Sequence, residues 1–130
     1  MTVARQVNPW SWQDRFGYSQ AWRVDDPGAL VFVAGQGSIS AAGELVGAGD
    51  FEAQARQTLA NLATVLEQAG AGLGSIVKLT VYLTEIASLR EYGRIRAELM
   101  PGHAPAGTAV EVAALAVPGM LIEVEAIATA

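Results

Sequence analysis

The hydrophobic positions of this chain change their period near residue 50, and that change predicts two helices set among strands. From Asp50 to Ala69 apolar residues recur at steps of three and four, the stripe of an amphipathic helix. Asp50 suits the N-cap, and Gly70 suits the left-handed position after the helix end. A second helix is expected over about 87–100, where Gly93 costs ~1 kcal/mol relative to alanine. Its expected apolar stripe is Leu89, Tyr92, Ile95 and Leu99.

Alternation of apolar and polar residues predicts the strands. The pattern is clearest across residues 75–84, where two sets of side chains point to opposite faces. One set is Val77, Leu79, Val81 and Leu83, and the other is Ile76, Lys78, Thr80 and Tyr82. The other expected strands cover residues 18–24, 29–36, 108–115 and 120–128.

Turn and loop signals separate these elements. Residues 25–28 (DDPG) join the first two strands, and residues 101–107 form a loop rich in proline and glycine. Residues 37–49 contain four glycines and are expected to form a loop with a short strand around Leu45. Residues 1–17 are expected to be an irregular lead-in.

The predicted order is ββ-α-β-α-ββ in a single domain over residues 1–130. The central strand, the second helix and the next strand form a parallel crossover, which should be right-handed. Both helices can then pack on one face of a mixed sheet, which gives a two-layer α+β domain.

Composition adds an interface to this picture. Hydrophobic residues make up 52% and charged residues 16% of the chain, and the mean hydropathy is +0.30. No apolar run approaches the ~20 residues of a membrane span, so the surplus apolar surface is expected in contacts between subunits.

Charge and residue usage exclude several kinds of site. The chain has no cysteine and one histidine, so no metal site is expected. Its net charge of −5 argues against a nucleic-acid partner. The first residues lack an export signal, which predicts a cytoplasmic protein.

The sheet face that the helices leave uncovered is the candidate for chemistry. Alternation predicts that this face collects three carboxylates, one ammonium and two hydroxyls, from Glu111, Glu123, Glu125, Lys78, Thr80 and Tyr82. Such a set fits a solvated, ion-paired face. It also fits the lining of a shared cleft in which a desolvated glutamate handles protons.

The cations outside this face have plain structural interpretations. Arg90, Arg94 and Arg96 are expected to pair with Glu91 and Glu98 at the surface. The single histidine, His103, lies in a loop before a strand, where a bystander role is the commoner one. The glycine clusters at 35–37 and 70–74 lack the context of a phosphate cradle and are interpreted as turns.

Seven short stretches, in order along the chain, resemble the Rid (YjgF/RidA) family of enamine/imine deaminases. They are residues 18–21 (YSQA), 33–36 (VAGQ), 54–62 (QARQTLANL), 77–82 (VKLTVY), 105–106 (PA), 110–115 (VEVAAL) and 122–128 (IEVEAIA). The resemblance implies a chorismate-mutase-like fold and a homotrimer with three clefts between subunits that bind a small molecule. It also implies hydrolysis of 2-imino or 2-enamino acids to 2-keto acids and ammonia, without a metal or organic cofactor.

The resemblance also assigns roles to particular positions. Glu125 would position the attacking water and Tyr18 would line the cleft. Members of the family carry an arginine after the Pro-Ala pair that grips the substrate carboxylate, and this chain has Gly107 there. Backbone N–H groups of Gly107 and Thr108 are then the obvious donors. Further departures from residues that many members carry are Ala34 for serine, Gly93 for asparagine and Ala109 for cysteine.

Three functions follow from this departure. The first is a trimer whose hydrolytic chemistry is altered toward a neutral or differently anchored carbonyl or imine compound, with Glu125 as anchor or base. The second retains deamination, with Arg94, Arg96 or His103 supplying the cation. The third is a non-catalytic trimer that senses a ligand or binds a partner. RNA cleavage, attributed to some relatives, fits the net charge of −5 poorly.

Overall fold

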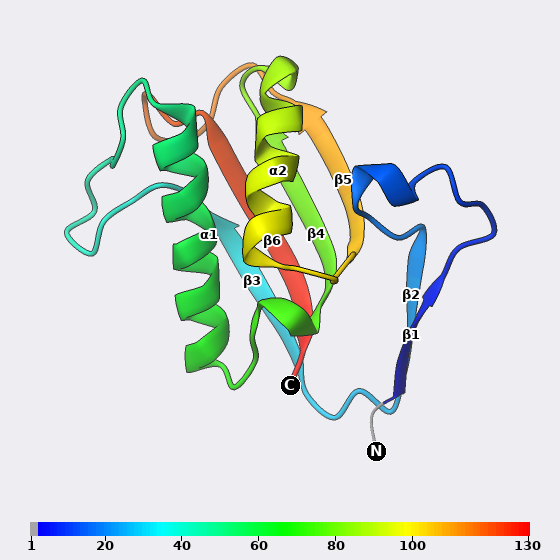
Figure 1. Ribbon diagram of the computed structural model, residues 1–130. Helices are drawn as coiled ribbons and strands as arrows, with labels where there is room; N and C mark the ends of the chain where they lie inside the picture. Colours follow the sequence, from blue (N-terminus) through cyan, green and yellow to red (C-terminus); the bar gives the residue numbers. More distant parts are fainter. Residues whose placement is uncertain (1–2) are drawn as a thin grey trace.

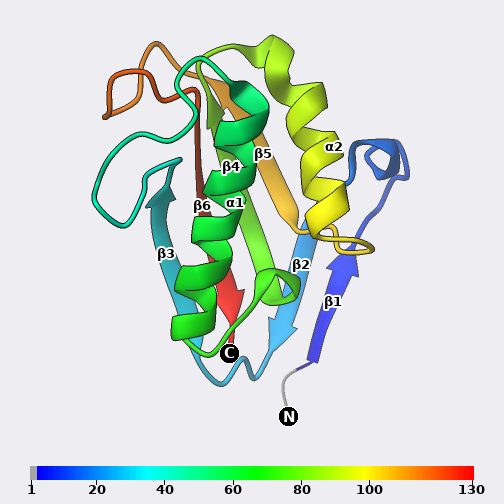
Figure 2. The same ribbon diagram turned by 60° about the vertical axis from the view of Figure 1, so that its left-hand side comes forward.

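A four-stranded mixed sheet carries both helices on one face (Figures 1 and 2). The computed structural model describes residues 3–130. Its sheet order is β3-β6-β4-β5, in which β4 and β5 are parallel and the other pairs antiparallel. The elements are β1 (Val3–Val7), η1 (Asp14–Phe16), β2 (Ala21–Asp25), β3 (Leu30–Gln36), α1 (Phe51–Gln68), η2 (Leu73–Ser75), β4 (Ile76–Leu83), η3 (Ile86–Ser88), α2 (Leu89–Leu99), β5 (Ala106–Glu111) and β6 (Ile122–Thr129). The predicted α+β arrangement and parallel crossover are confirmed.

The N-terminal lead-in differs from its prediction. β1 pairs antiparallel with β2 in a separate two-stranded ribbon, so the expectation of an irregular segment is wrong for Val3–Val7; residues 1 and 2 lie outside the described part. Four of its five residues are exposed, so backbone pairing rather than burial stabilises β1, and no hydrophobic pattern marks it. A bridge between Ser19 and Ala106 ties this ribbon to β5.

Helix α1 follows its sequence signals closely. The Asp50 carboxylate accepts a hydrogen bond from the Ala53 N–H at 3.0 Å, and Gly70 takes the left-handed conformation with φ +80°. The apolar stripe packs on the sheet, where Leu59, Leu62, Leu66, Ile122 and Val124 are fully buried.

Helix α2 buries a narrower stripe than predicted. Tyr92 and Ile95 enter the core, but Leu89 and Leu99 are 36% and 39% exposed because they are the first and last residues of an 11-residue helix. Arg96 is buried in their place, so the expected four-residue stripe is wrong at both ends.

Strand β4 buries Leu79, Val81 and Leu83, as predicted. Ile76 is also fully buried, which contradicts the prediction that it shares a face with Lys78. The register against β6 shifts between Ile76 and Lys78, so this irregularity turns the Ile76 side chain into the core.

Two polar side chains of α1 hold the neighbouring loops. The buried Gln54 donates to the carbonyls of Gly47 and Gly119 at 3.2 and 3.0 Å and accepts from the Leu121 N–H at 2.9 Å. Asn61 donates to the carbonyls of Gly37 and Ile39. In residues 37–49 the structure has a single antiparallel bridge between Ile39 and Leu45 at the place where a short strand was expected. None of the helices in residues 3–130 has the length and apolar content to cross a membrane.

Candidate functional site

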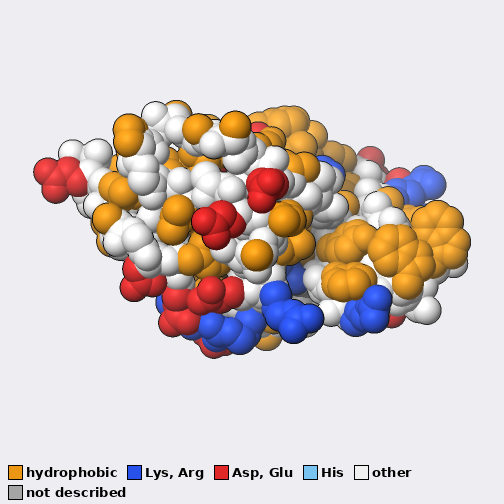
Figure 3. Space-filling view, turned by 90° about the horizontal axis from the view of Figure 1, so that it is seen from above, with side chains coloured by type: hydrophobic (Ala, Val, Ile, Leu, Met, Phe, Trp, Pro, Cys, Tyr) orange, Lys and Arg blue, Asp and Glu red, His pale blue; other side chains and the backbone are white. Residues whose placement is uncertain are grey.

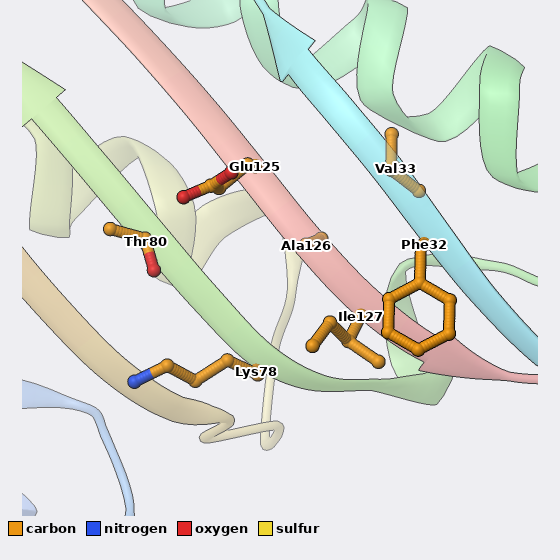
Figure 4. Close-up of a pocket in the computed structure, with 7 residues that line it drawn as sticks. All are labelled: Phe32, Val33, Lys78, Thr80, Glu125, Ala126 and Ile127. Carbon is orange, nitrogen blue, oxygen red and sulfur yellow. The ribbon is translucent and has the colours of Figure 1, made fainter.

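The open face of the sheet, the side without helices, gathers the polar side chains of β4 and β6. Along β6 the residues Val124 and Ala126 are buried under the helices, so the alternating Glu123, Glu125 and Ile127 point the other way. The register sets Thr80 directly opposite Glu125 and Lys78 opposite Ile127. Figure 4 shows these side chains projecting from their two strands.

A shallow hollow of about 310 Å³ lies on this open face. It is lined by Phe32, Val33, Lys78, Thr80, Glu125, Ala126 and Ile127. Its polar groups lie over β4 and the adjoining part of β6, whereas Ile127 and Phe32 form an apolar end beside β3 (Figure 4). The hollow therefore offers a carboxylate, an ammonium and an apolar surface to one small molecule.

Tyr82 holds the Glu125 carboxylate from one side. The Tyr82 hydroxyl donates a hydrogen bond to Glu125 Oε1. This bond, partial burial and the negative charge of Glu125 raise the pKa of Tyr82 above its usual value of 10.0. The phenol stays protonated at neutral pH and keeps donating, so Glu125 is presented as an oriented carboxylate, as a base or water-holding group requires.

Lys78 is the cation of the hollow, and the sequence pattern placed it on this face without singling it out as a site residue. Its Nζ donates to Thr108 Oγ1 at 3.2 Å. Among residues 3–130 no carboxylate lies within ion-pairing distance of Lys78. The alternation of residues 75–84 is the signal that could have identified it. Lys78, Thr80 and Tyr82 occupy the open-face positions of this strand, and Lys78 is the charged residue among them.

Glu111 does not join this face, which corrects the prediction of three carboxylates there. β5 runs parallel to β4 with Glu111 beside the buried Leu83 and Val110 beside Tyr82. Glu111 therefore points to the helix side, where its Oε1 accepts from the Ile86 N–H at 2.9 Å. A polar residue at the end of an edge strand can point to the helix side or to the open face. The polarity of Glu111 was therefore not enough to predict its face.

The remaining predicted site residues divide between the two faces. Thr108 pairs with Thr80 on the open face. Ala34 lies in a bulge where it and Gly35 together oppose Glu125, and a Cβ at Gly35 would collide with the Glu123 carboxylate at 2.0 Å.

Gly107 and Ala109 point to the opposite, helix-covered side, because their partners are the core residues Leu79 and Val81. A Cβ at Gly107 would lie 3.4 Å from Cβ of Tyr18, so these two residues are neighbours. The ring of Tyr18 packs edge-on against Trp12.

Gly93 lies within α2, in the helix layer. A single chain therefore does not bring Glu125 together with Tyr18, Gly107, Ala109 or Gly93.

The three cations considered as substitutes for arginine are engaged elsewhere. Arg94 pairs with Glu52 at 2.9 Å and approaches Glu91 and Glu98 at 4.0 and 3.8 Å. Arg96 pairs with neither glutamate, contrary to prediction: it is 7% exposed and donates to the carbonyls of Gly17 and His103. Arg96 lies on the buried side of α2, so its guanidinium reaches backbone carbonyls instead of the surface glutamates.

His103 is tied to the backbone as well. Its Nε2 lies 2.6 Å from the Ile76 carbonyl oxygen, and its ring contacts Trp22. This environment supports the structural interpretation of the histidine.

Seen from above, the surface shows neighbouring opposite charges and a patch of apolar side chains (Figure 3). Acidic and basic side chains lie side by side along the helix layer, where Arg56 pairs with Glu98 at 2.7 Å. Apolar side chains gather at the end that carries η1, where Trp10, Trp12 and Phe16 are exposed. In residues 3–130 no three side chains of the metal-binding types come together as a possible metal site.

Known proteins share both the sequence and the fold. Residues 13–130 match the family described as Endoribonuclease L-PSP. A RutC family protein of Pyrococcus abyssi is 41% identical over 85% of this chain and 84% of its own length. A protein of Rattus norvegicus named 2-iminobutanoate/2-iminopropanoate deaminase is 40% identical over 85% of this chain and 78% of its own length.

Solved structures agree with these relatives. A protein of unknown function of the conserved Rid family from Yersinia pestis superposes with a TM-score of 0.89 at 37% identity, covering 98% of both chains. A member of the YjgF family from Mycobacterium tuberculosis gives a TM-score of 0.68 at 35% identity, over 98% of this chain and 100% of its own. The mixed sheet with two helices is thus the YjgF/chorismate-mutase-like fold, and the chain belongs to the Rid (YjgF, Endoribonuclease L-PSP) family.

Proposed function

We propose that this protein is a homotrimer whose inter-subunit clefts bind a small compound of the carbonyl or imine type and hydrolyse the C=N bond of the imine form, with Glu125 as the base. The observation that carries the proposal is the oriented carboxylate of Glu125 at a hollow that also offers Lys78 and an apolar end. The deaminase name of the rat relative, at 40% identity, supports the same reaction type.

The chemistry needs a water, a base and a proton path. Glu125 accepts a proton from water as the water oxygen attacks the carbon of the protonated imine, whose nitrogen becomes a neutral amine. Glu125 then returns this proton to the nitrogen, and the C–N bond breaks as the new hydroxyl gives up its proton to Glu125. Ammonia leaves and the carbonyl product remains. The Tyr82 hydroxyl keeps the Glu125 carboxylate in place during these steps. No metal or organic cofactor takes part in this scheme.

The positions of the site residues favour a cleft between subunits. Gly107 and Tyr18 lie on the helix side of the sheet edge, whereas Glu125 lies on the open face, so one chain cannot enclose a ligand with all three. The open face also leaves Phe32 71% and Leu30 48% exposed. Burying such a surface against a second copy would both cover it and complete a cleft.

The absence of a side chain at Gly107 is the reason to propose altered chemistry. A charge-assisted hydrogen bond contributes ~1.5–3 kcal/mol, so an arginine fork at that position would strengthen carboxylate binding at least 10-fold. Arg94, Arg96 and His103 are bound to other groups, which weakens the alternative in which one of them replaces it. RNA cleavage has less support still, because Arg56 and Arg94 are paired with glutamates.

Hydrolysis of 2-iminopropanoate, made in situ by an amino-acid oxidase, tests the proposal. Wild type should accelerate ammonia release, and Glu125→Ala should remove at least ~100-fold of that acceleration. Glu123→Ala, a change on the same strand and face, should retain the activity. An inert wild type, or an active Glu125→Ala, would overturn the hydrolytic function. If the inert protein still bound a ligand, the result would support the non-catalytic, ligand-sensing trimer instead.

Gly107→Arg tests the altered anchoring separately. The space around Gly107 tolerates a Cβ, with its nearest contact at an ordinary 3.4 Å, so the variant should fold. It should raise kcat/KM for 2-iminopropanoate about 10- to 100-fold. Gly74→Arg adds the same charge at a position where a Cβ meets nothing within 4 Å and should leave the rate unchanged. No gain in Gly107→Arg would mean that this position does not face the substrate.

A further inference from the structure

We infer that Trp12 determines the specificity of this protein: together with the ring of Tyr18 it binds the flat aromatic group of an uncharged aryl imine and of the aryl ketone formed from it. The inference rests on the proposed function, because it names the substrate class of the same cleft between subunits. We call the pair of rings, Trp12 and Tyr18, the aromatic corner.

Polar side chains hold the loop that carries Trp12. This loop joins β1 to β2 and lies beside α2 (Figure 2). Gln13 is fully buried in it, donates to the Trp10 carbonyl at 2.9 Å and accepts from the Gln20 amide at 3.2 Å. Asn8 accepts from the Gln20 N–H at 2.7 Å. The loop is therefore fixed from inside, while the indoles of Trp10 and Trp12 stay 59% and 54% exposed.

The two rings of the aromatic corner stand at a steep angle to each other. Their centroids are 6.2 Å apart and their planes are inclined by 72°. Aromatic rings prefer offset-stacked or edge-to-face contacts, with centroids about 4.5–7 Å apart. A flat ring that stacks parallel to Trp12 stands nearly edge-on to Tyr18, so one ligand ring satisfies both preferences. A saturated ring satisfies neither.

Gly107 leaves the Tyr18 side of the corner uncovered. A Cβ at Gly107 would have the Tyr18 Cβ as its nearest neighbour, at 3.4 Å, so a side chain at this position of β5 would stand against Tyr18. Tyr18 is only half-buried and Trp12 is exposed. The position without a side chain and the exposed rings thus belong to one continuous surface, which connects the aromatic corner to the proposed cleft.

The two arginines next to the corner are engaged by other groups. Arg15 of the same loop lies over the Phe16 ring, with its Cζ 4.6 Å from the ring centroid. Arg96 donates to the carbonyl of Gly17, the neighbour of Tyr18. The corner itself consists of uncharged rings, so it favours a neutral aromatic group. A carboxylate would lose water there without gaining a cation.

The ligand reaches Glu125 across the contact between two copies. Tyr18 lies on the side of Gly107 and Glu125 lies on the open face, so the corner of one copy takes the ring while Glu125 of a second copy faces the C=N carbon. The reaction is the hydrolysis already proposed: an aryl ketimine and water give an aryl ketone and ammonia.

Binding of acetophenone, followed by NMR titration of the full-length protein, tests the aromatic corner. Acetylcyclohexane is the matched ligand, because it has the same acetyl group and the same number of carbon atoms on a ring that is neither flat nor aromatic. Wild type should bind acetophenone about fivefold more tightly than acetylcyclohexane. Trp12→Leu keeps an apolar side chain and should abolish this preference, whereas Trp12→Phe should keep most of it.

Phe16→Leu is the matched control. It removes an exposed ring of the same region that Arg15 covers, so it should leave both affinities unchanged. Sedimentation should give Trp12→Leu the mass of wild type. The inference would be overturned by a wild type that does not prefer acetophenone, by an unchanged preference in Trp12→Leu, or by an equal loss in Phe16→Leu. A lower mass of Trp12→Leu would also overturn it, because the rings would then be a contact between copies.

Kinetics separate this inference from the proposed function. The substrate is the imine of acetophenone, made in situ from 1-phenylethylamine by an amine oxidase. Trp12→Leu should raise KM about fivefold with little change in kcat, whereas Glu125→Ala should lower kcat and still bind acetophenone. A wild type that binds acetophenone through Trp12 but releases no ammonia contradicts the proposed function and supports the aromatic corner. Ammonia release with an unchanged kcat/KM in Trp12→Leu contradicts the aromatic corner and leaves the function standing.

Discussion

At the scale of single residues, Tyr92 carries a buried hydroxyl whose polar atom has no hydrogen-bond partner among residues 3–130. The side chain is 4% exposed, and burial raises the pKa of Tyr92 well above 10.0, against a smaller opposing effect of Arg96. An unpaired buried hydroxyl costs about 1–3 kcal/mol of desolvation. Tyr92→Phe should therefore raise the free energy of unfolding by about 1 kcal/mol, measured by chemical denaturation at pH 7.

The same substitution has a pH signature. The unfolded chain loses its tyrosine protons near pH 10, whereas folded Tyr92 keeps its proton, so stability is full below pH 10 and falls as the pH rises above it. Tyr92→Phe should lose less stability between pH 9 and 11 than wild type does. The Tyr92 hydroxyl would have a hydrogen-bond partner after all if the variant were less stable than wild type at pH 7. The same conclusion would follow if its free energy of unfolding fell as steeply as that of wild type between pH 9 and 11.

At the scale of elements, Gln54 joins α1 to two loops. Its amide makes three hydrogen bonds to the backbone of Gly47, Gly119 and Leu121 from a fully buried position. Gln54→Leu preserves much of the side-chain volume but leaves these groups unpaired, which should lower the free energy of unfolding by about 2–4 kcal/mol. Denaturation measures the loss, and faster hydrogen exchange of the Leu121 amide should locate it.

Gln68 provides the matched control for this prediction. It lies on the same helix and is exposed, so Gln68→Leu should change the free energy of unfolding by no more than about 0.5 kcal/mol. Equal effects of the two substitutions would show that the loops do not depend on the Gln54 amide.

The elements that could be predicted from the sequence are those that bury one face in a regular period. Helix α1 and strand β6 follow their apolar stripes because each packs one side against the core along its whole length. β1 could not be predicted in this way, since its pairing with β2 uses the backbone and leaves its side chains exposed. The irregularity before Lys78 also escapes a strict period of two, which is why the pattern misplaces Ile76.

At the scale of the whole molecule, the candidate site depends on how strands meet, and that is only partly predictable. Alternation within one strand places Glu125, Lys78 and Thr80 on the open face. The face of Glu111 depends instead on the register between β5 and β4, which the composition of an edge strand does not determine. The register between β5 and β4 also places Gly107 on the face opposite Glu125. A site that uses both residues therefore needs a contact between two copies of the chain.

The open face of β3 is where that contact is predicted. Phe32, 71% exposed, continues an apolar strip with Leu30 beside the hollow, and burying it in a trimer would remove this surface from water. Phe32→Asp places a charge there, so sedimentation should shift from three times the 13.6 kDa chain mass to the monomer. Val65→Asp makes the same change on exposed α1 and should remain trimeric. A monomeric wild type would contradict the inter-subunit cleft, and a trimeric Phe32→Asp would move the interface to another surface, such as the aromatic patch of Trp10 and Trp12.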